Sequence, residues 1–418
     1  MISYKNFLLE SAPIKNLHLE HIEDEIFNNG VRGAREAINF LRSLRDMLSG
    51  DSPTPVTVTV KFDGAPAIFV GTDPADGKFF VGTKGVFNKN PKVIKKESDI
   101  SELGYKGGLA EKLKVAFNEM KSLGIKDVLQ GDIMFTSGDL EKANIDGETY
   151  TIFQPNTIVY AVPYGSDLDK KIRKAEIGVV FHTTYTGESL EGMGASFGAD
   201  VSDLYKTPNV WYSDVNYQDF SGSVTMTSSE TTQITSHLSK AGKTFHTIKT
   251  SSLDRFLKFQ NDFPSNLTGA TIKTYNNSKI RQGEKVVDPV SHSKGYIQYI
   301  HDYFNAKVFP KVKSEKGKEN KEKQMQLIVS SSEKMMSTIV SCMRLHNYLV
   351  DAKMIIIEKL NNGAKRFPNT FVRTDSGYKV VNDEGYVAID KSSGGAVKLV
   401  DRLEFSYNNF NGIKNWDK

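Results

Sequence analysis

Residues 56–64 read VTVTVKFDG, and this stretch decides how the fold is interpreted. Its first five residues alternate valine and threonine, a period of two that is typical of a half-buried β-strand. Lys61 ends the strand, and Asp63 and Gly64 favour a turn after it. A lysine at the end of a buried strand can act as a nucleophile if neighbouring cations or a metal ion lower its pKa. The alternative is a surface lysine that begins an ordinary β-turn.

The pattern on either side of this stretch predicts an α+β protein. Residues 1–50 read as helical, because apolar side chains recur at helical spacing from Ala34 to Leu48. Strands are expected over residues 56–60, 67–70 and 79–81, paired as an antiparallel meander. A helix over 108–123 is expected next, followed by strands over 128–135, 150–153, 157–162 and 177–185.

The chain then becomes helical from about residue 221 to residue 366. The best helix candidates there are 251–259, 293–304 and a long helix over 320–360. Strand patterns return over 371–373, 378–381, 386–389 and 396–405, so we expect them to complete the sheet begun before the helices. The predicted parts are an N-terminal helical segment (1–50), a β-rich domain (51–220 with 367–418) and an inserted helical domain (221–366).

The composition is that of a globular protein. At 418 residues and 39% hydrophobic, the chain can form two or three domains with real cores. No apolar run approaches the roughly 20 residues that a membrane span requires, and the cluster at residues 7–9 is too short for a signal peptide. We therefore expect a cytoplasmic protein with no membrane partner. The single cysteine, Cys342, excludes an internal disulfide and predicts a small core residue.

The charge distribution permits nucleic-acid binding but does not require it. The formal net charge is only +4, so any such binding depends on a local patch. Seven lysines stand against three glutamates between Lys307 and Lys323. This segment is either a solvated loop or helix end, or a flexible arm that contacts phosphates.

Three further motifs accompany the opening stretch. Residues 129–135 read LQGDIMF, residues 384–388 read EGYVA, and residues 394–399 read GGAVKL. In this order the set resembles the motifs of the covalent nucleotidyltransferases, which include ATP-dependent DNA and RNA ligases and capping enzymes. It is most similar to an RNA-ligase-like branch of tailed bacteriophages, over roughly residues 55–185 and 370–405. The resemblance implies a ligase-type domain of antiparallel sheets flanked by helices, with a mostly helical inserted domain, working in the host cytoplasm.

The resemblance implies a catalytic group around Lys61. This lysine would attack the α-phosphate of ATP, expel pyrophosphate and carry AMP on its side chain, while Lys398 would grip the α-phosphate. Lys398 and the metal ion would also depress the pKa of Lys61. Asp63 could orient the amine or a sugar hydroxyl, and Gly64 could let a backbone N–H approach a phosphate.

The resemblance also implies a nucleotide and metal site. Asp132 would hold the ribose, Phe181 would stack on the adenine, and Lys84 would stand at the acceptor side of the nucleotide. Glu384, with Asp132, would bind Mg²⁺ or Mn²⁺. Each residue has a structural alternative: Phe181 could be a core residue, Asp132 could open a turn, and Glu384 could end a hairpin.

The sequence departs from the family pattern at three motif positions and near its end. Asp132 stands where relatives often carry glutamate, Lys84 stands where many carry arginine, and Lys398 lacks a second lysine, for which Arg402 could substitute. Only 16 residues follow Arg402, too few for an oligonucleotide-binding barrel. A standard DNA ligase or capping enzyme is therefore disfavoured, and the inserted helices with the basic segment would have to engage nucleic acid.

Residues 18–24 read HLEHIED and raise the question of a metal site, because His18 and His21 are three residues apart. We favour a solvated acidic helix face, since no third ligand is indicated.

The leading prediction is an ATP-dependent nucleotidyltransferase that transfers AMP to a polynucleotide 5′-phosphate, with RNA favoured over DNA. Two alternatives stay open: a catalytically degenerate ligase-like module that binds nucleotide or regulates, and AMP transfer to an acceptor other than nucleic acid. The sequence leaves the acceptor and the oligomeric state open.

Overall fold

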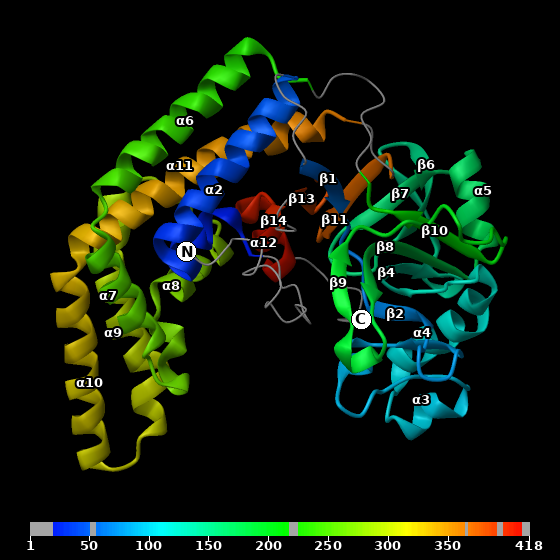
Figure 1. Cartoon of the computed structure of the whole chain (residues 1–418), viewed down its shortest axis with the longest axis horizontal. Helices are drawn as coiled ribbons and strands as arrows, with labels where there is room; N and C mark the ends of the chain where they lie inside the picture. The colour runs from blue at the N-terminus through cyan, green and yellow to red at the C-terminus, as the bar shows by residue number, and fades with distance from the viewer. Residues whose placement is uncertain (1–19, 51–55, 217–224, 364–366, 391–395, 412–418) are drawn as a thin grey trace, which may run out of the picture.

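The computed structural model describes residues 20–50, 56–216, 225–363, 367–390 and 396–411. Helices gather in one part of the molecule and sheets in another, and strand β1 with its partners lies between them (Figure 1). All strand pairs but one are antiparallel among the named strands, the exception being β10 with β8. The prediction of an α+β protein with antiparallel sheets is confirmed.

The helices and strands have the following bounds. The strands are β1 (Val56–Lys61), β2 (Ala67–Thr72), β3 (Phe79–Gly82), β4 (Val128–Thr136), β5 (Glu141–Ile145), β6 (Glu148–Phe153), β7 (Val159–Pro163), β8 (Ile177–Thr186), β9 (Gly194–Phe197), β10 (Val210–Asp214), β11 (Asn369–Thr374), β12 (Gly377–Val380), β13 (Gly385–Asp390) and β14 (Ala396–Leu399). The α-helices are α2 (Glu25–Ser49), α3 (Ser98–Glu102), α4 (Gly107–Met120), α5 (Asp167–Lys174), α6 (Ser228–Thr247), α7 (Thr250–Asn261), α8 (Ile272–Arg281), α9 (Pro289–Tyr303), α10 (Glu315–Lys334), α11 (Met336–Asn361) and α12 (Arg402–Asn411). Short 3-10 helices include η1 (Ile22–Asp24) and η2 (Lys84–Phe87).

The first sheet has the strand order β1-β13-β14. Val58 lies opposite Ala388, and these residues with Leu399 belong to the core that the helices form. Because side chains alternate along a strand, Thr59 and Lys61 lie on the other face of the sheet. The predicted meander is confirmed for β2 and β3, which pair antiparallel, and wrong for β1, which pairs with a strand from the far end of the chain.

The other two sheets form the rest of the β-rich part. One has the order β10-β8-β4-β2-β3, with β9 added to β8, and the other has the order β12-β11-β7-β6-β5. β11 pairs with β7, just as β13 pairs with β1. Strands from before and after the helical stretch thus share two sheets, which confirms that the later strands complete sheets begun earlier.

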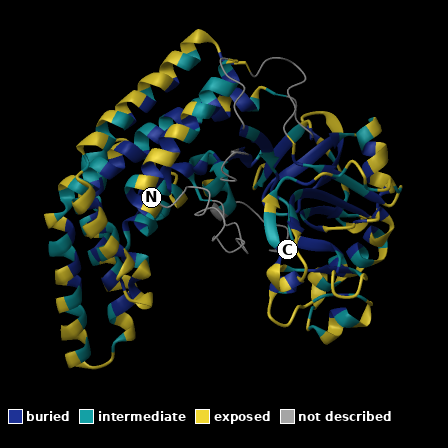
Figure 2. Ribbon diagram, in the orientation of Figure 1, coloured by how far each residue is buried: buried dark blue, intermediate teal, exposed yellow. Residues whose placement is uncertain are grey.

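The helical part has one large core that includes α2, α6 and α11. Figure 2 shows buried residues on the inner sides of these helices and of the sheets, with exposed residues outside. The single helix expected over 320–360 is two helices, α10 and α11, which meet at Met335. Cys342 is fully buried in this core, as predicted, and burial raises the pKa of its thiol to about 12.

The strand expected over 396–405 ends at Leu399 and gives way to α12. The carboxylate of Asp401 accepts hydrogen bonds from the backbone N–H groups of Leu403 and Glu404 at 3.0 and 3.2 Å. An aspartate in this position caps the first turn of a helix. The apolar residues after Asp401 therefore belong to a helix, and the strand prediction is wrong from there on.

The expected solvated acidic face is also wrong, because Glu23 and Asp24 are 1% exposed. Lys353 on α11 donates to Glu23 at 2.7 Å, and its own side chain is 1% exposed. Arg402 donates to Asp24 at 3.2 Å and to Glu23 at 3.4 Å. The two acids thus form a buried ion cluster with two cations from distant segments. His18 lies outside the described residues.

Among the helices that the structure describes, none is long and apolar enough to cross a membrane.

Candidate functional site

Lys61 and Glu384 meet where β1 begins to pair with β13. Lys61 lies opposite Gly385 in the strand register, so the residue before Gly385 comes beside the lysine. Nζ of Lys61 donates to Oε2 of Glu384 in an ion pair whose carboxylate side chain is 9% exposed and whose lysine side chain is 27% exposed. The strand pairing therefore joins the KFDG and EGYVA motifs in one place.

Both members of this ion pair have a raised pKa in the structure. Burial disfavours the charge on Lys61, but the carboxylates of Glu384, Asp132 and Asp63 outweigh burial and raise the pKa of Lys61. This raised pKa belongs to the protein without metal or nucleotide, and the predicted depression by Lys398 together with a bound metal ion stays a prediction. Burial raises the pKa of Glu384 to about 7, with a further contribution from Asp63, although Lys61 acts in the opposite direction. Glu384 can therefore exchange a proton near neutral pH.

Lys398 lies on the same face of the first sheet as Lys61. Thr59 pairs with Val387, and Val387 pairs with Lys398, so these positions share a row across the three strands. Lys61 is two residues beyond Thr59 and therefore points to the same side. Burial, and after it the charge of Lys61, lower the pKa of Lys398.

Asp63 has a different role from the one expected. Its carboxylate accepts hydrogen bonds from the Asn156 side chain at 2.6 Å and from the backbone N–H groups of Thr157 and Ile158 at 2.7 and 2.9 Å. Its own backbone N–H donates to the Tyr160 hydroxyl at 2.7 Å. The expectation that Asp63 orients the amine by direct contact is replaced by an anchoring role, because its oxygens hold the loop before β7.

Gly64 brings the KFDG turn close to β4. A Cβ atom at this position would lie 2.5 Å from Cβ of Asp132 and 3.1 Å from the sulfur of Met134. Only glycine permits this approach without movement of β4. Asp132 is thereby held near Lys61, and its carboxylate lies 3.7 Å from Nε2 of His182 on β8.

Of the predicted nucleotide contacts, Phe181 does not lie at this site as expected, and Lys84 is untested. Phe181 is 0% exposed and packs in the core of the second sheet with Val179 and Ile133, so the predicted stacking on adenine is wrong in this structure. Lys84 is exposed at the start of η2. β3 ends at Gly82, so its register does not extend to Lys84, and the role of Lys84 at the acceptor side of the nucleotide stays a prediction.

The sequence interpretation missed Asn156 and Tyr160, which hold Asp63 from either side. Burial raises the pKa of the Tyr160 hydroxyl well above its ordinary value. The turn residues Pro155 and Asn156 between two strands were the only local signal, because nothing in the sequence indicates that this loop meets the KFDG turn.

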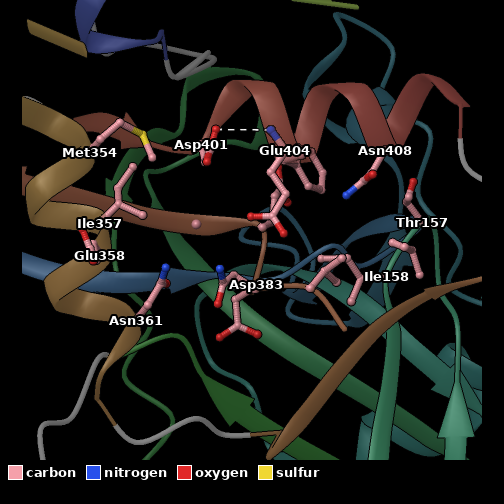
Figure 3. A pocket seen from close by; sticks show the side chains of 16 residues that line it. Thr157, Ile158, Met354, Ile357, Glu358, Asn361, Asp383, Asp401, Glu404 and Asn408 are labelled. Atoms are coloured by element: carbon pink, nitrogen blue, oxygen red, sulfur yellow. Dashed lines mark hydrogen bonds between the residues drawn. The ribbon is translucent and has the colours of Figure 1, made fainter. Parts of the chain in front are cut away.

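A first cavity, of about 230 Å³, lies on one side of α12 (Figure 3). We call it the acidic cavity, because five carboxylate residues line it: Glu358, Asp383, Glu384, Asp401 and Glu404. These residues come from α11, from the loop before β13 and from the start of α12 (Figure 3). Glu384 thus stands between Lys61 and this cavity.

A second cavity, of about 260 Å³, lies on the other side of α12. We call it the basic cavity, and its charged and polar lining is Glu20, His21, Asp24, Lys273, Asn277, Arg281, Lys398, Arg402 and Ser406. Arg402 cannot replace a second catalytic lysine as expected, because it is engaged with Glu23 and Asp24 in the buried ion cluster.

The carboxylates near Lys61 fit a Mg²⁺ ion held mainly by water and phosphate. Glu384 forms an ion pair with Lys61, and the charge of Asp132 also helps to raise the pKa of Lys61. Mg²⁺ in phosphate-transfer sites commonly uses one or two carboxylates, with substrate phosphates and water completing its coordination. In the described part of the chain, no group of three or more His, Cys, Asp or Glu residues is arranged to hold a metal by itself.

Comparison with known proteins assigns most of the chain to a family. A family model described as "Family of unknown function (DUF6267)" matches residues 16–414. The comparisons with curated proteins and with solved structures each gave no match.

Proposed function

We propose that this chain, which belongs to the family of unknown function DUF6267, is an ATP-dependent nucleotidyltransferase that forms a covalent lysyl-AMP at Lys61. The observation that carries the proposal is the pairing of β1, β13 and β14. This sheet joins Lys61 to Glu384 and brings Lys398 to the same face. A nucleophile, a proton acceptor and a cation at one site suit nucleotidyl transfer, which depends on positioning and on charge around the phosphorus.

The reaction begins with proton transfer from the Lys61 ammonium to Glu384, whose pKa of about 7 suits a proton acceptor near neutral pH. The neutral amine attacks the α-phosphorus of ATP, so that an N–P bond forms as the bond from phosphorus to the bridging oxygen breaks. Pyrophosphate leaves with the electron pair and takes up the second amine proton. Lys398 offsets the negative charge on the α-phosphate, and Mg²⁺, when bound, adds positive charge near the phosphates.

A polynucleotide 5′-phosphate is the acceptor that we propose, with RNA favoured and DNA also allowed. A 3′-hydroxyl would then displace AMP and join the ends. Support comes from an open cavity of about 510 Å³ whose lining includes Lys171, Lys174, Lys206 and Trp211. Cations beside an aromatic ring suit single-stranded nucleic acid.

The basic segment from Lys307 to Lys323 offers less support for acceptor binding. It lies at the outer end of the helical part, where α10 begins (Figure 1). Lys318 and Lys323 form ion pairs with glutamates of the same helix, at 2.9 and 2.7 Å. We therefore expect that excision of residues 305–325 leaves acceptor affinity unchanged.

Intact mass spectrometry after incubation with ATP and Mg²⁺ tests the proposal. The wild-type protein should gain one AMP, and pyrophosphate or hydroxylamine should remove it. Lys61→Ala should gain none, whereas Lys78→Ala, which removes a lysine that is 70% exposed, should react as the wild type does. An AMP adduct on the Lys61→Ala protein would remove Lys61 from its role.

The raised pKa of Lys61 favours one alternative, a ligase-like module that binds nucleotide without reaction. A protonated lysine held by carboxylates is a poor nucleophile. This alternative predicts ATP binding with no AMP adduct at any pH. AMP transfer to an acceptor other than nucleic acid predicts an adduct, but no sealing of nicked or single-stranded RNA and DNA.

A further inference from the structure

A further cavity, of about 300 Å³, lies in the helical part beside the buried ion cluster, and we call it the helical cavity. Glu23, Lys353 and Arg402 of the ion cluster line it. Its aliphatic lining comes from α8 and the loop after it, from α11 and from α12: Ile280, Val286, Val350, Met354 and Leu403. Pockets that hold small molecules have volumes from roughly 300 Å³ upward, so the cavity is large enough for a small ligand. The proposed reaction at Lys61 uses none of these side chains.

Three residues of this lining carry a buried polar atom that has no hydrogen-bond partner among the described residues. The atoms are Oε2 of Glu23, Nε2 of His346 and Nε of Arg402. These residues are 1%, 4% and 7% exposed, and they come from η1, α11 and α12. A buried polar atom without a partner is costly, and folded proteins satisfy such atoms with protein groups, ordered water or a ligand. Three of them beside one cavity therefore indicate a bound molecule.

The unpartnered atoms define the hydrogen bonds that a ligand must make. Burial disfavours the charge on Glu23, but Lys353 and Arg402 outweigh burial and hold the pKa of Glu23 well below its ordinary value. Its carboxylate therefore only accepts, whereas the Nε–H group of Arg402 only donates. Burial lowers the pKa of His346 although Asp24 and Glu23 oppose it, so the ring is neutral near pH 7. Because Arg402 and Glu23 are in contact at 3.4 Å, the ligand needs a donor and an acceptor close together.

The charges beside the helical cavity favour an uncharged ligand. The buried ion cluster is balanced, because the carboxylates of Glu23 and Asp24 face the cations of Lys353 and Arg402. A net charge placed beside this cluster would lose its water without gaining a counter-ion. The other charged residues of the lining are exposed or partly exposed: Glu284, Lys285, Asp351 and Asp401.

We propose that the helical cavity binds an uncharged nucleobase, with the edge of the base toward Glu23 and Arg402. A nucleobase carries an N–H donor beside a ring-nitrogen or carbonyl acceptor on its edge, as in adenine. The donor would bond to the carboxylate of Glu23 and the acceptor to the Nε–H group of Arg402. The faces of the ring would pack against aliphatic side chains such as Val286 and Val350. This site is separate from the reaction at Lys61, so the inference does not depend on the proposed function.

Calorimetric titration of the full chain with 9-methyladenine and with 9-methylpurine tests the hydrogen bonds. The two compounds share the same ring and the same methyl group, but only 9-methyladenine has an amino group that can donate to Glu23. Wild-type protein should bind 9-methyladenine. It should bind 9-methylpurine at least about tenfold more weakly, the effect of losing one hydrogen bond to a charged group.

Two neighbouring valines provide a matched pair of variants that tests the location. Val286 lines the helical cavity, whereas Val287 lies outside its lining and is 86% exposed. Val286→Phe places a ring in the cavity and should remove 9-methyladenine binding. The backbone carbonyl of Val286 still accepts from the Asn347 side chain, at 2.8 Å, so the loop keeps its anchor. Val287→Phe makes the same change next to it and should bind as the wild type does, and circular dichroism checks that both variants fold.

The outcomes separate this inference from the proposed function. Absence of 9-methyladenine binding to the wild type would overturn it, because water alone would then satisfy the buried atoms. Equal affinity for the two compounds, or equal effects of Val286→Phe and Val287→Phe, would also overturn it. Binding that is lost in Lys61→Ala and kept in Val286→Phe would place the base at the nucleotide site instead. Binding that depends on Val286 in a protein that never gains AMP would support the cavity and remove the proposed function alone.

Discussion

Replacement of Glu384 by glutamine should stabilise the protein at alkaline pH while it removes a group that the proposed reaction needs. The pKa of Glu384 is about 7, against an ordinary value of 4.5, a difference of roughly 2.5 pH units. Each unit corresponds to about 1.4 kcal/mol. Ionisation of this buried carboxyl therefore lowers the free energy of unfolding by on the order of 3 kcal/mol.

The sign follows from the direction of the pKa change. The folded protein holds the Glu384 proton more tightly than the unfolded chain does, so the associated stability is fully present below about pH 4.5. It is lost as the pH rises to about 7. Glutamine resembles the protonated side chain at every pH. Glu384→Gln should therefore match the wild type near pH 4.5 and exceed its stability at pH 8 by on the order of 3 kcal/mol.

Urea denaturation at pH 4.5 and pH 8, followed by circular dichroism, measures this difference. Titrating groups outside the ion pair change both proteins equally, so the comparison reports on Glu384 together with Lys61, whose pKa Glu384 raises. Glu358→Gln makes the same chemical change in the acidic cavity, and its free energy of unfolding should differ between the two pH values as that of the wild type does. The reasoning would be refuted if the Glu384→Gln protein were less stable than the wild type at pH 8. It would also be refuted if the free energies of unfolding of the two proteins differed by the same amount at both pH values. The same variant should gain no AMP.

Three further substitutions test other parts of the structure. Lys353→Met leaves the buried carboxylate of Glu23 with a weaker set of partners and should lower the free energy of unfolding by about 3–5 kcal/mol in urea denaturation, whereas a neutral effect would mean that the cluster is solvated. Gly64→Ala forces β4 or the turn to move and should reduce ATP binding in calorimetry while costing about 1–3 kcal/mol of stability; unchanged binding would show that the close approach is dispensable. Phe181→Leu should cost about 1–2 kcal/mol with ATP affinity preserved, and a selective loss of that affinity would restore the stacking role.

Local patterns in the sequence predict which segments are strands and helices but not which strands pair. The alternation over residues 56–60 gives β1 correctly, because side-chain alternation is a property of the strand itself. Its partner β13 is fixed by packing against the helical core, and Val58 and Ala388 meet there only in the folded protein. Pairing of β1 with β2 is the simplest arrangement that the local sequence predicts, but long-range packing pairs β1 with β13 instead.

The sequence likewise predicts only part of the arrangement of side chains at the site. The proximity of Lys61 and Glu384 follows the order of the motifs, and their ion pair agrees with that expectation. Phe181 could not be distinguished from a stacking residue, because an apolar ring serves a core equally well. Glu23 looked solvated because its neutralising cation, Lys353, is 330 residues away in sequence.

The β1–β13 pairing also determines how late in synthesis the first sheet can form. Thr59 and Val387, which are bonded across this pair, are separated by 328 positions in the chain. At roughly 5–20 residues per second, a ribosome needs tens of seconds to add them. Throughout this interval the edge of β1 that later binds β13 is unpaired, so the newly made chain should depend on holding factors before Lys61 acquires its partner.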